Sequence, residues 1–172
     1  MRGELDFETS LRARVALLKG LSASVFDTVF KSIHLSKNAQ EFISILQKKG
    51  ILVSLVSGGF TPIIERLAKS LGISYFSANQ LEVKDGFLTG KLVGEIVIGQ
   101  VKKATLERWR KELGLSKERT IAIGDGANDL LMLKSAGHGI AFCAKEVVKA
   151  EIACHVDTRD LLEVLPLIDF LE

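Results

Sequence analysis

The stretch IAIGDGANDLLML, residues 121–133, places an apolar strand-like run directly before a polar turn and a helix-like run. The turn carries two carboxylates and an amide, on Asp125, Asp129 and Asn128, with glycine on both sides of the first carboxylate. These oxygen atoms could hold a hard cation, lie beside a phosphate, or form a polar helix start, where Asp and Asn are favoured. Because ligands of open α/β sheets bind outside the carboxyl ends of strands, the turn is a candidate functional site.

Strand-like and helix-like runs alternate from residue 39 to the end of the chain. This alternation predicts an α/β domain with a parallel sheet and right-handed crossovers. Asp85-Gly86 lies between two β-rich runs and predicts a hairpin over residues 81–96. The helical runs at 7–19 and 22–32 do not join the alternation, so we expect a helical cap over residues 1–36 and an α/β core over 37–172. Expected strands lie at 51–56, 73–76, 120–124, 139–143 and 152–156, and expected core helices at 38–49, 61–71, 102–113, 129–135, 147–150 and 160–171.

Composition narrows the classes of partner. The 172 residues are 47% hydrophobic and 26% charged, and the net charge of +2 comes from interspersed acids and bases. A nucleic-acid partner is disfavoured because no basic stripe is present, and a membrane partner because the apolar runs are short. The start, MRGELDFETS, lacks the apolar region of a signal peptide, so we expect a cytoplasmic protein. Cys143 and Cys154 are expected to be buried thiols, with a disulfide between them left open.

Two further polar features lie before the 121–133 stretch. Ser57-Gly58-Gly59 follows an apolar run, and its hydroxyl and backbone N–H groups could cradle a phosphate or simply form a strand-to-helix turn. Lys102 or Lys103 opens a later helix. An ammonium group held there could neutralise a phosphate, or it could be an ordinary solvated helix lysine.

The chain carries SGGF, then a lysine-led helix, then GDGANDLLML. These three elements and their order resemble those of the haloacid dehalogenase (HAD) superfamily of phosphohydrolases. The closer resemblance is to its phosphoserine phosphatases, through FETSLRARVALLKGL, NQLEVKDGFLTGKLVGEI and IAFCAKEVVKAEIACHVDTRDL, and it covers essentially the whole chain. The resemblance implies a HAD-like Rossmannoid parallel sheet with a small helical cap and a β-hairpin. It also implies Mg²⁺-dependent hydrolysis of O-phosphoserine to L-serine and phosphate, a step of serine biosynthesis.

The resemblance assigns roles around the phosphoryl group. Ser57 and Gly58 would hold the transferring group, Lys102 would neutralise it, and Asn128 would touch the phosphate side.

The resemblance also assigns metal and cap residues. Asp125 would ligate Mg²⁺, and Asp129 would support the metal site, either directly or through its surroundings. In the cap, Arg14 would face the substrate carboxylate, for which a guanidinium is a bidentate match, and Phe7 would wall the pocket. A solvated helix face for Arg14 and a core position for Phe7 stay open, and Glu8 has no clear role.

One element of the resembled enzymes is missing from the 172 residues. Those phosphatases attack with an aspartate of a DxD motif at the end of the first strand, forming an aspartyl-phosphate. The spacing DxD occurs nowhere here. Asp27, in SVFDTVF, lacks the second aspartate, and Asp157 and Asp160 are spaced DxxD. We therefore expect the chain by itself to be inactive or very weak.

The resemblance implies that the missing strand is central in the sheet, between the strands that end at Ser57 and Gly124, so its absence would leave two unpaired edges. Three arrangements remain open. The chain could be a truncated form, or one that starts late at Met1, of a longer enzyme; a partner in a homo-oligomer could donate a strand or segment; or the chain's own N-terminal segment could fill the gap. Two other functions also stay open, namely a non-catalytic module that binds phosphate or phosphoserine, and a phosphatase for another small phosphomonoester.

Overall fold

The computed structural model describes residues 2–168, and they form two compact units. The first unit contains the chain up to His34 and Val53–Ile98, and the second contains Leu35–Leu52 and the chain from Gly99 onward. Each unit holds one three-stranded sheet with helices packed against it. The expected α/β class is confirmed in both units.

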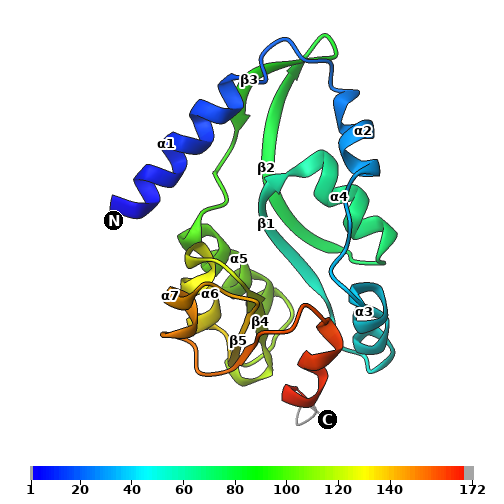
Figure 1. Ribbon diagram of the computed structural model, residues 1–172, viewed down its shortest axis with the longest axis vertical. Helices are drawn as coiled ribbons and strands as arrows, with labels where there is room; N and C mark the ends of the chain where they lie inside the picture. Colours follow the sequence, from blue (N-terminus) through cyan, green and yellow to red (C-terminus); the bar gives the residue numbers. More distant parts are fainter. Residues whose placement is uncertain (1, 169–172) are drawn as a thin grey trace. The chain divides into compact units, whose positions relative to one another are not determined.

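In the first unit, a parallel strand pair is extended by an antiparallel hairpin (Figure 1). The sheet order is β1-β2-β3, with β1 and β2 parallel and β2 and β3 antiparallel. Helix α4 packs on β1 and β2, α1 packs on β3, and α2 packs on α4. The elements are α1 (Arg2–Ala16), α2 (Val25–Lys31), β1 (Ser54–Phe60), α4 (Thr61–Ser70), β2 (Tyr75–Lys84) and β3 (Phe87–Val93).

The predicted hairpin over 81–96 is confirmed. Asp85 and Gly86, at its tip, both have positive φ angles of 51° and 81°, as a two-residue type I′ turn requires. The hairpin side chains Leu81 and Leu88 are buried with Leu11 of α1 in one apolar cluster. Burial of these side chains is what attaches the first helix to the hairpin.

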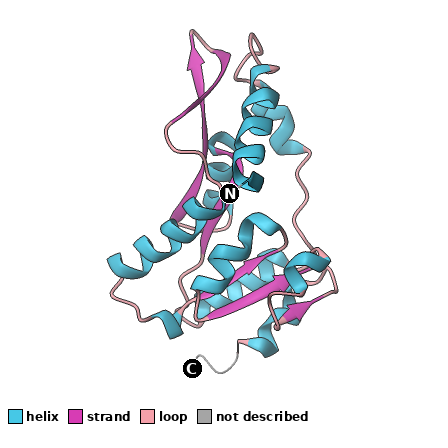
Figure 2. Ribbon diagram, turned by 90° about the vertical axis from the view of Figure 1, so that its left-hand side faces the viewer, coloured by secondary structure: helices cyan, strands magenta, loops and turns pink. Residues whose placement is uncertain are grey.

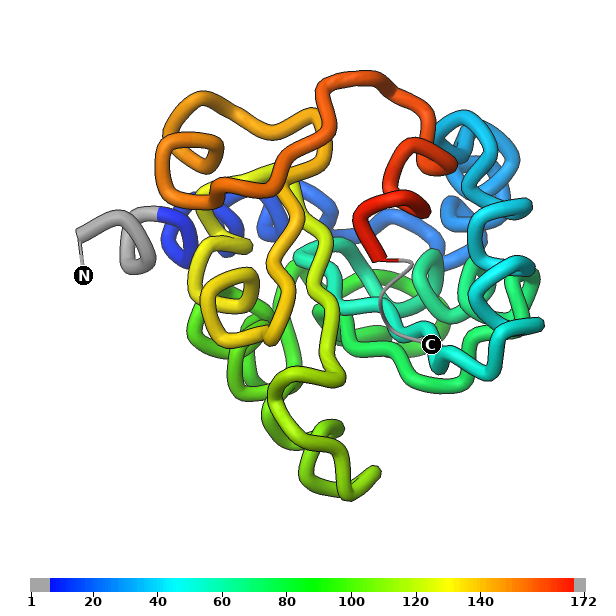
Figure 3. Tube along the Cα trace, turned by 90° about the horizontal axis from the view of Figure 1, so that it is seen from below, coloured from blue at the N-terminus to red at the C-terminus, as the bar shows by residue number. Residues whose placement is uncertain are grey.

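The second unit is built on a short parallel sheet, β4-β5-β6, visible in Figure 2. Helix α5 packs on α6, and α6 packs on β4 and β5, around a core that includes Met132, Leu133 and Val148. Figure 3 shows the C-terminal η3 beside α3, where the Lys37 ammonium lies 2.8 Å from Asp160 Oδ2. The elements are α3 (Ala39–Lys48), α5 (Gly99–Glu112), η1 (Lys117–Arg119), β4 (Ile121–Gly124), η2 (Ala127–Asp129), α6 (Leu130–Ser135), β5 (His138–Phe142), α7 (Glu146–Lys149), β6 (His155–Val156) and η3 (Leu161–Leu167).

Several predicted boundaries are wrong. Strand β1 begins at Ser54 and continues through the Ser57-Gly58-Gly59 segment, because β2 supplies pairing partners as far as Asn79, with a register shift between Ser57 and Phe60. Strand β2 is one long strand where a short one at 73–76 and a separate hairpin arm were expected. The closing segment is a 3₁₀ helix that contains Pro166, a residue that cannot donate a backbone hydrogen bond. The predicted helix end beyond residue 168 lies outside the described residues.

Both strands expected to flank a gap lie at the edge of their sheets. Strand β1 is the terminal strand of one sheet and β4 of the other. Residues 2–16 are helical, so the alternative in which this N-terminal segment supplies a strand is wrong. The cap boundary at 36/37 stays a prediction, since contacts group α1 and α2 with β1–β3.

Two other expectations concern the thiols and the membrane. Cys143 and Cys154 are free and only partly buried, so the disulfide does not form. Within residues 2–168, no helix combines the length and apolar character that crossing a bilayer requires.

Candidate functional site

The turn after β4 is organised by the carboxylate of Asp129. This residue is 4% exposed, and its Oδ2 accepts the backbone N–H groups of Asp125, at 3.2 Å, and Gly126, at 3.1 Å. Its own N–H donates to the Gly126 carbonyl at 2.9 Å. A carboxylate that accepts backbone N–H groups in this way fixes the path of the loop.

Lys102 of α5 reaches the other oxygen of the same carboxylate. Its Nζ lies 2.6 Å from Asp129 Oδ1, and the two side chains are only 7% and 6% exposed. The interpretation of Lys102 as a solvated helix lysine is therefore wrong. Lys103 is the solvated one, 41% exposed and 3.8 Å from Glu107. Charged side chains are rarely buried unless they are paired. This ion pair is therefore the point in the second unit where two opposite charges are kept away from solvent.

Gly124 allows Asp129 to come this close. A Cβ atom built at Gly124 would lie 2.6 Å from the Asp129 Cβ, well inside van der Waals contact. A Cβ at Gly126 would collide with the Asn128 amide oxygen. The two glycines of the GDGAND segment are thus required by close packing within the turn.

Asp125 projects from the end of β4 and is exposed, unlike Asp129. Its carbonyl accepts the Lys145 N–H at 3.1 Å, which holds the backbone below the side chain. The Asp125 carboxylate therefore suits one ligand position of a hard cation, whereas both oxygens of Asp129 already accept hydrogen bonds. Among the side chains that the structure describes, those of residues 7–168, no cluster of three or more His, Cys, Asp or Glu could hold a metal.

In the first unit, Ser57 and Gly58 form a corner near the end of β1. The Ser57 Oγ accepts the Gly59 N–H at 3.0 Å, so its hydroxyl proton stays available to donate. Asn79, 1% exposed, donates to the Gly58 carbonyl at 2.8 Å and accepts the Val97 N–H at 2.8 Å. The sequence reasoning missed Asn79, and its only signal was a polar amide inside a β-rich run.

The two cap residues lie in different environments. Phe7 is partly buried against the α1–hairpin cluster, and its Cζ would be 3.8 Å from a Cβ built at Gly58. The structure thus brings Phe7 to the serine-glycine corner and also places it at the margin of a core. Arg14 is exposed and its Nε donates to the Ser10 carbonyl at 3.3 Å, so its substrate role stays a prediction. Glu8 pairs with Arg12 at 2.8 Å.

Residues 1–134 match the family model of the haloacid dehalogenase-like hydrolases, and the chain belongs to this family. The phosphoserine phosphatase of Streptococcus thermophilus is 53% identical over 169 residues, which cover 98% of this chain and 79% of that protein. The phosphoserine phosphatase of Methanocaldococcus jannaschii is 44% identical over 165 residues, covering 96% and 78%.

Solved structures agree with these relatives. A substrate-bound phosphoserine phosphatase complex superposes with a TM-score of 0.90 at 43% identity, covering 97% of this chain and 80% of that chain. A phospho-aspartyl intermediate analogue of phosphoserine phosphatase matches with the same TM-score, identity and coverage. The predicted HAD-like fold is confirmed. The chain is a member of the haloacid dehalogenase-like hydrolases, and the relatives and structures named above, to which it is similar, are phosphoserine phosphatases.

Proposed function

We propose that the residues of this chain serve the Mg²⁺-dependent hydrolysis of O-phosphoserine to L-serine and phosphate. One observation carries the proposal: the buried Lys102–Asp129 ion pair shapes the loop that presents Asp125 at the end of β4. The similarity to phosphoserine phosphatases across nearly the whole chain supports the choice of reaction and substrate.

The chain's residues would bind and neutralise the phosphoryl group. The Ser57 hydroxyl would donate to a phosphoryl oxygen, and Gly58 would leave room for the group to approach the backbone. Lys102 carries three N–H donors and its bond to Asp129 uses one, so the others would face the phosphoryl oxygens. The Asn128 amide would donate a hydrogen bond to the phosphoryl group from the loop that follows β4. Such preorganised donors stabilise charge that grows in the transition state.

Mg²⁺, when bound, would act as a Lewis acid on the phosphoryl oxygens. Asp125 would hold it, and Asp129 would orient the loop without ligating it directly, because both of its oxygens are already engaged. One exposed carboxylate is fewer than a dedicated site uses, so we propose that Mg²⁺ binds these 172 residues weakly.

The covalent step needs a nucleophilic aspartate that none of the chain's eight aspartates supplies in DxD spacing. In that step a carboxylate oxygen would bond to phosphorus while the serine oxygen leaves with a proton, and water would then cleave the aspartyl-phosphate. Three off-motif candidates are already engaged. Asp27 pairs with Arg66 at 2.6 Å, and Asp157 and Asp160 pair with lysines at 2.6 and 2.8 Å.

We therefore propose that the 172 residues alone release phosphate from O-phosphoserine feebly or not at all. A phosphate-release assay with and without Mg²⁺ measures this, with Asp125→Asn as the matched variant that removes the metal carboxylate. Fast Mg²⁺-dependent turnover that Asp125→Asn abolishes would sink the inactivity proposal and demand another nucleophile.

The edge positions of β1 and β4 support association through an exchanged strand or segment. We propose a homo-oligomer, measured by light scattering coupled to size-exclusion chromatography. A strictly monomeric chain at micromolar concentration would contradict the proposal.

A non-catalytic phosphate-binding module is a second candidate function. One observation favours it: the serine-glycine corner and the Asp125 loop are both formed in a chain that lacks the DxD motif. Such a module would be stabilised by inorganic phosphate or O-phosphoserine without turnover. A thermal shift that Ser57→Ala abolishes, with no phosphate released, would favour the module over an inactive fragment.

Substrate choice is testable through Arg14. In a version of the enzyme that carries a DxD strand, Arg14→Ala should raise the KM for O-phosphoserine more than for phosphomonoesters without a carboxylate. Arg12→Ala, two residues away and paired with Glu8, is the matched control. Equal effects of Arg14→Ala on all substrates would favour a different small phosphomonoester.

A further inference from the structure

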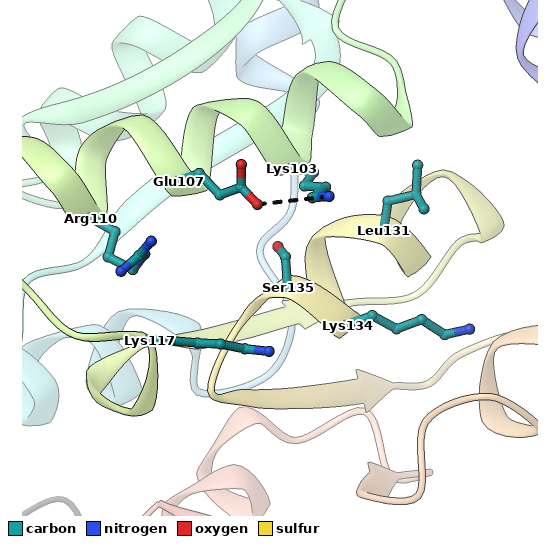
Figure 4. A pocket seen from close by; sticks show the side chains of 7 residues that line it. All are labelled: Lys103, Glu107, Arg110, Lys117, Leu131, Lys134 and Ser135. Carbon is teal, nitrogen blue, oxygen red and sulfur yellow. Dashed lines mark ion pairs between the residues drawn. The ribbon is translucent and has the colours of Figure 1, made fainter.

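The second unit carries a groove between α5, η1 and α6 that the proposed reaction does not use. It has a volume of about 340 Å³. Figure 4 shows side chains from α5 directed toward α6 and the segment around η1. We call it the basic groove, because four of its seven lining residues are cations. They are Lys103, Arg110, Lys117 and Lys134, with Glu107, Leu131 and Ser135 completing the lining.

The geometry points to this groove as a binding site for a short linear polyphosphate, such as the triphosphate group shared by inorganic tripolyphosphate and nucleoside triphosphates. The site is separate from the phosphoryl-binding residues of the proposed reaction. Lys102 is buried against Asp129, whereas its neighbour Lys103 lines the groove.

Three cations are placed to contact one extended anion. Lys103 and Arg110 are seven residues apart on α5, so they share a helix face and lie roughly 10 Å apart along the axis. Lys117 faces them from η1 (Figure 4). A single phosphate cannot reach all three, whereas a chain of phosphates can. None of the lining residues is aromatic, so nothing there would stack on a nucleobase.

The carboxylates Glu107 and Glu118 offset these three cations only in part. Glu107 lies 3.8 Å from Lys103, and both side chains are 41% exposed. This ion pair is therefore weak, and an anion that binds Lys103 can replace Glu107 at little cost in free energy. The pKa of Glu118 is lowered first by its own backbone N–H and then by the Ser116 hydroxyl, with smaller contributions from Lys117 and Arg110. The local hydrogen bonds of Glu118 thus outweigh its interaction with the two groove cations.

Two cations of the groove make hydrogen bonds within the chain, and these bonds leave Lys134 secondary but Arg110 well placed for an anion. Lys134 is bonded to Glu151 at 2.6 Å, which places it at the margin. The Arg110 Nη1 donates to the Leu115 carbonyl at 3.3 Å, which orients the guanidinium and leaves its remaining N–H groups to donate. An oriented guanidinium loses little conformational freedom on binding an anion.

The test is the affinity of the whole chain for inorganic tripolyphosphate, measured by calorimetry without Mg²⁺ at low ionic strength. The double variant Arg110→Gln/Lys117→Gln should bind at least tenfold more weakly than the unchanged chain. The matched control Arg108→Gln/Lys111→Gln removes the same charge from α5 outside the groove, and it should stay within twofold. Circular dichroism without ligand checks that both variants are folded.

Further arms separate the possible sources of binding. Ser57→Ala should leave the tripolyphosphate affinity unchanged, and a loss there would overturn the inference by assigning the anion to the proposed reaction site. ATP should bind about as well as tripolyphosphate, and adenosine should not bind. Equal weakening by the two double variants, or no binding by the unchanged chain, would also overturn it. The measurement is independent of turnover, so failure of the proposed phosphatase activity would leave it intact.

Discussion

Replacing Lys102 by methionine should destabilise the second unit strongly, because it leaves the Asp129 carboxylate buried without its cation. The two charged atoms are 2.6 Å apart, and both side chains are almost fully buried. Removing one partner of a buried pair costs about 3–5 kcal/mol. Asp129 keeps two backbone N–H donors, so we expect the lower end, about 3 kcal/mol. For a chain of this length that corresponds to a Tm lower by roughly 6–12 °C.

Trp109 offers a local probe for this measurement. It is the chain's single tryptophan, lies on α5 and is 7% exposed, so its fluorescence in a urea titration follows the unfolding of the second unit. Lys103→Met is the matched control on the same helix. Its exposed ion pair should contribute less than about 1 kcal/mol.

A second variant separates charge burial from loss of packing. Asp129→Asn combined with Lys102→Met removes both charges but keeps an oxygen that can accept the loop N–H groups. It should regain at least about 1 kcal/mol over Lys102→Met alone, because no uncompensated charge remains. The reasoning is refuted if Lys102→Met and Lys103→Met are equally stable, or if the double variant is no more stable than Lys102→Met.

Asn79→Ala should lower the stability of the first unit by about 2–4 kcal/mol, because one buried and one partly buried backbone group lose their partner. A loss below about 1 kcal/mol in urea titrations followed by circular dichroism would contradict this. Gly124→Ala should cost about 1–3 kcal/mol by tryptophan fluorescence, since its Cβ would lie 2.6 Å from the Cβ of Asp129, and an unchanged midpoint would show that the turn can move aside. The hydrogen bond from Lys37 lowers the pKa of Asp160 below its unfolded value of about 3.9. This carboxylate therefore stabilises the second unit above about pH 4, and the contribution is lost as the pH falls through the lowered pKa. Asp160→Asn should accordingly reduce the drop in unfolding free energy between pH 6 and pH 3, and an identical drop in both proteins would refute the assignment.

The sequence alone determined the features that depend on local pattern. The alternation of strand-like and helix-like runs predicted an α/β fold, and Asp85-Gly86 predicted a hairpin whose tip needs two positive φ angles. The GDGAND segment after an apolar run marked the end of a strand, where Asp125 indeed lies. These predictions succeeded because turn chemistry and periodicity act over a few neighbouring residues.

Only the tertiary structure decided which lysine pairs with Asp129 and which amide joins distant backbone segments. Lys102 and Lys103 are equivalent in sequence, and burial against Asp129, 27 residues later, separates them. The Asn79 amide joins the backbone at Gly58, 21 residues before it, to the backbone at Val97, 18 residues after it, and no local pattern predicts that role. The extension of β1 through Ser57 likewise depends on pairing with β2. Burial, partner strands and long-range hydrogen bonds are set by packing between distant segments, and no local pattern encodes them.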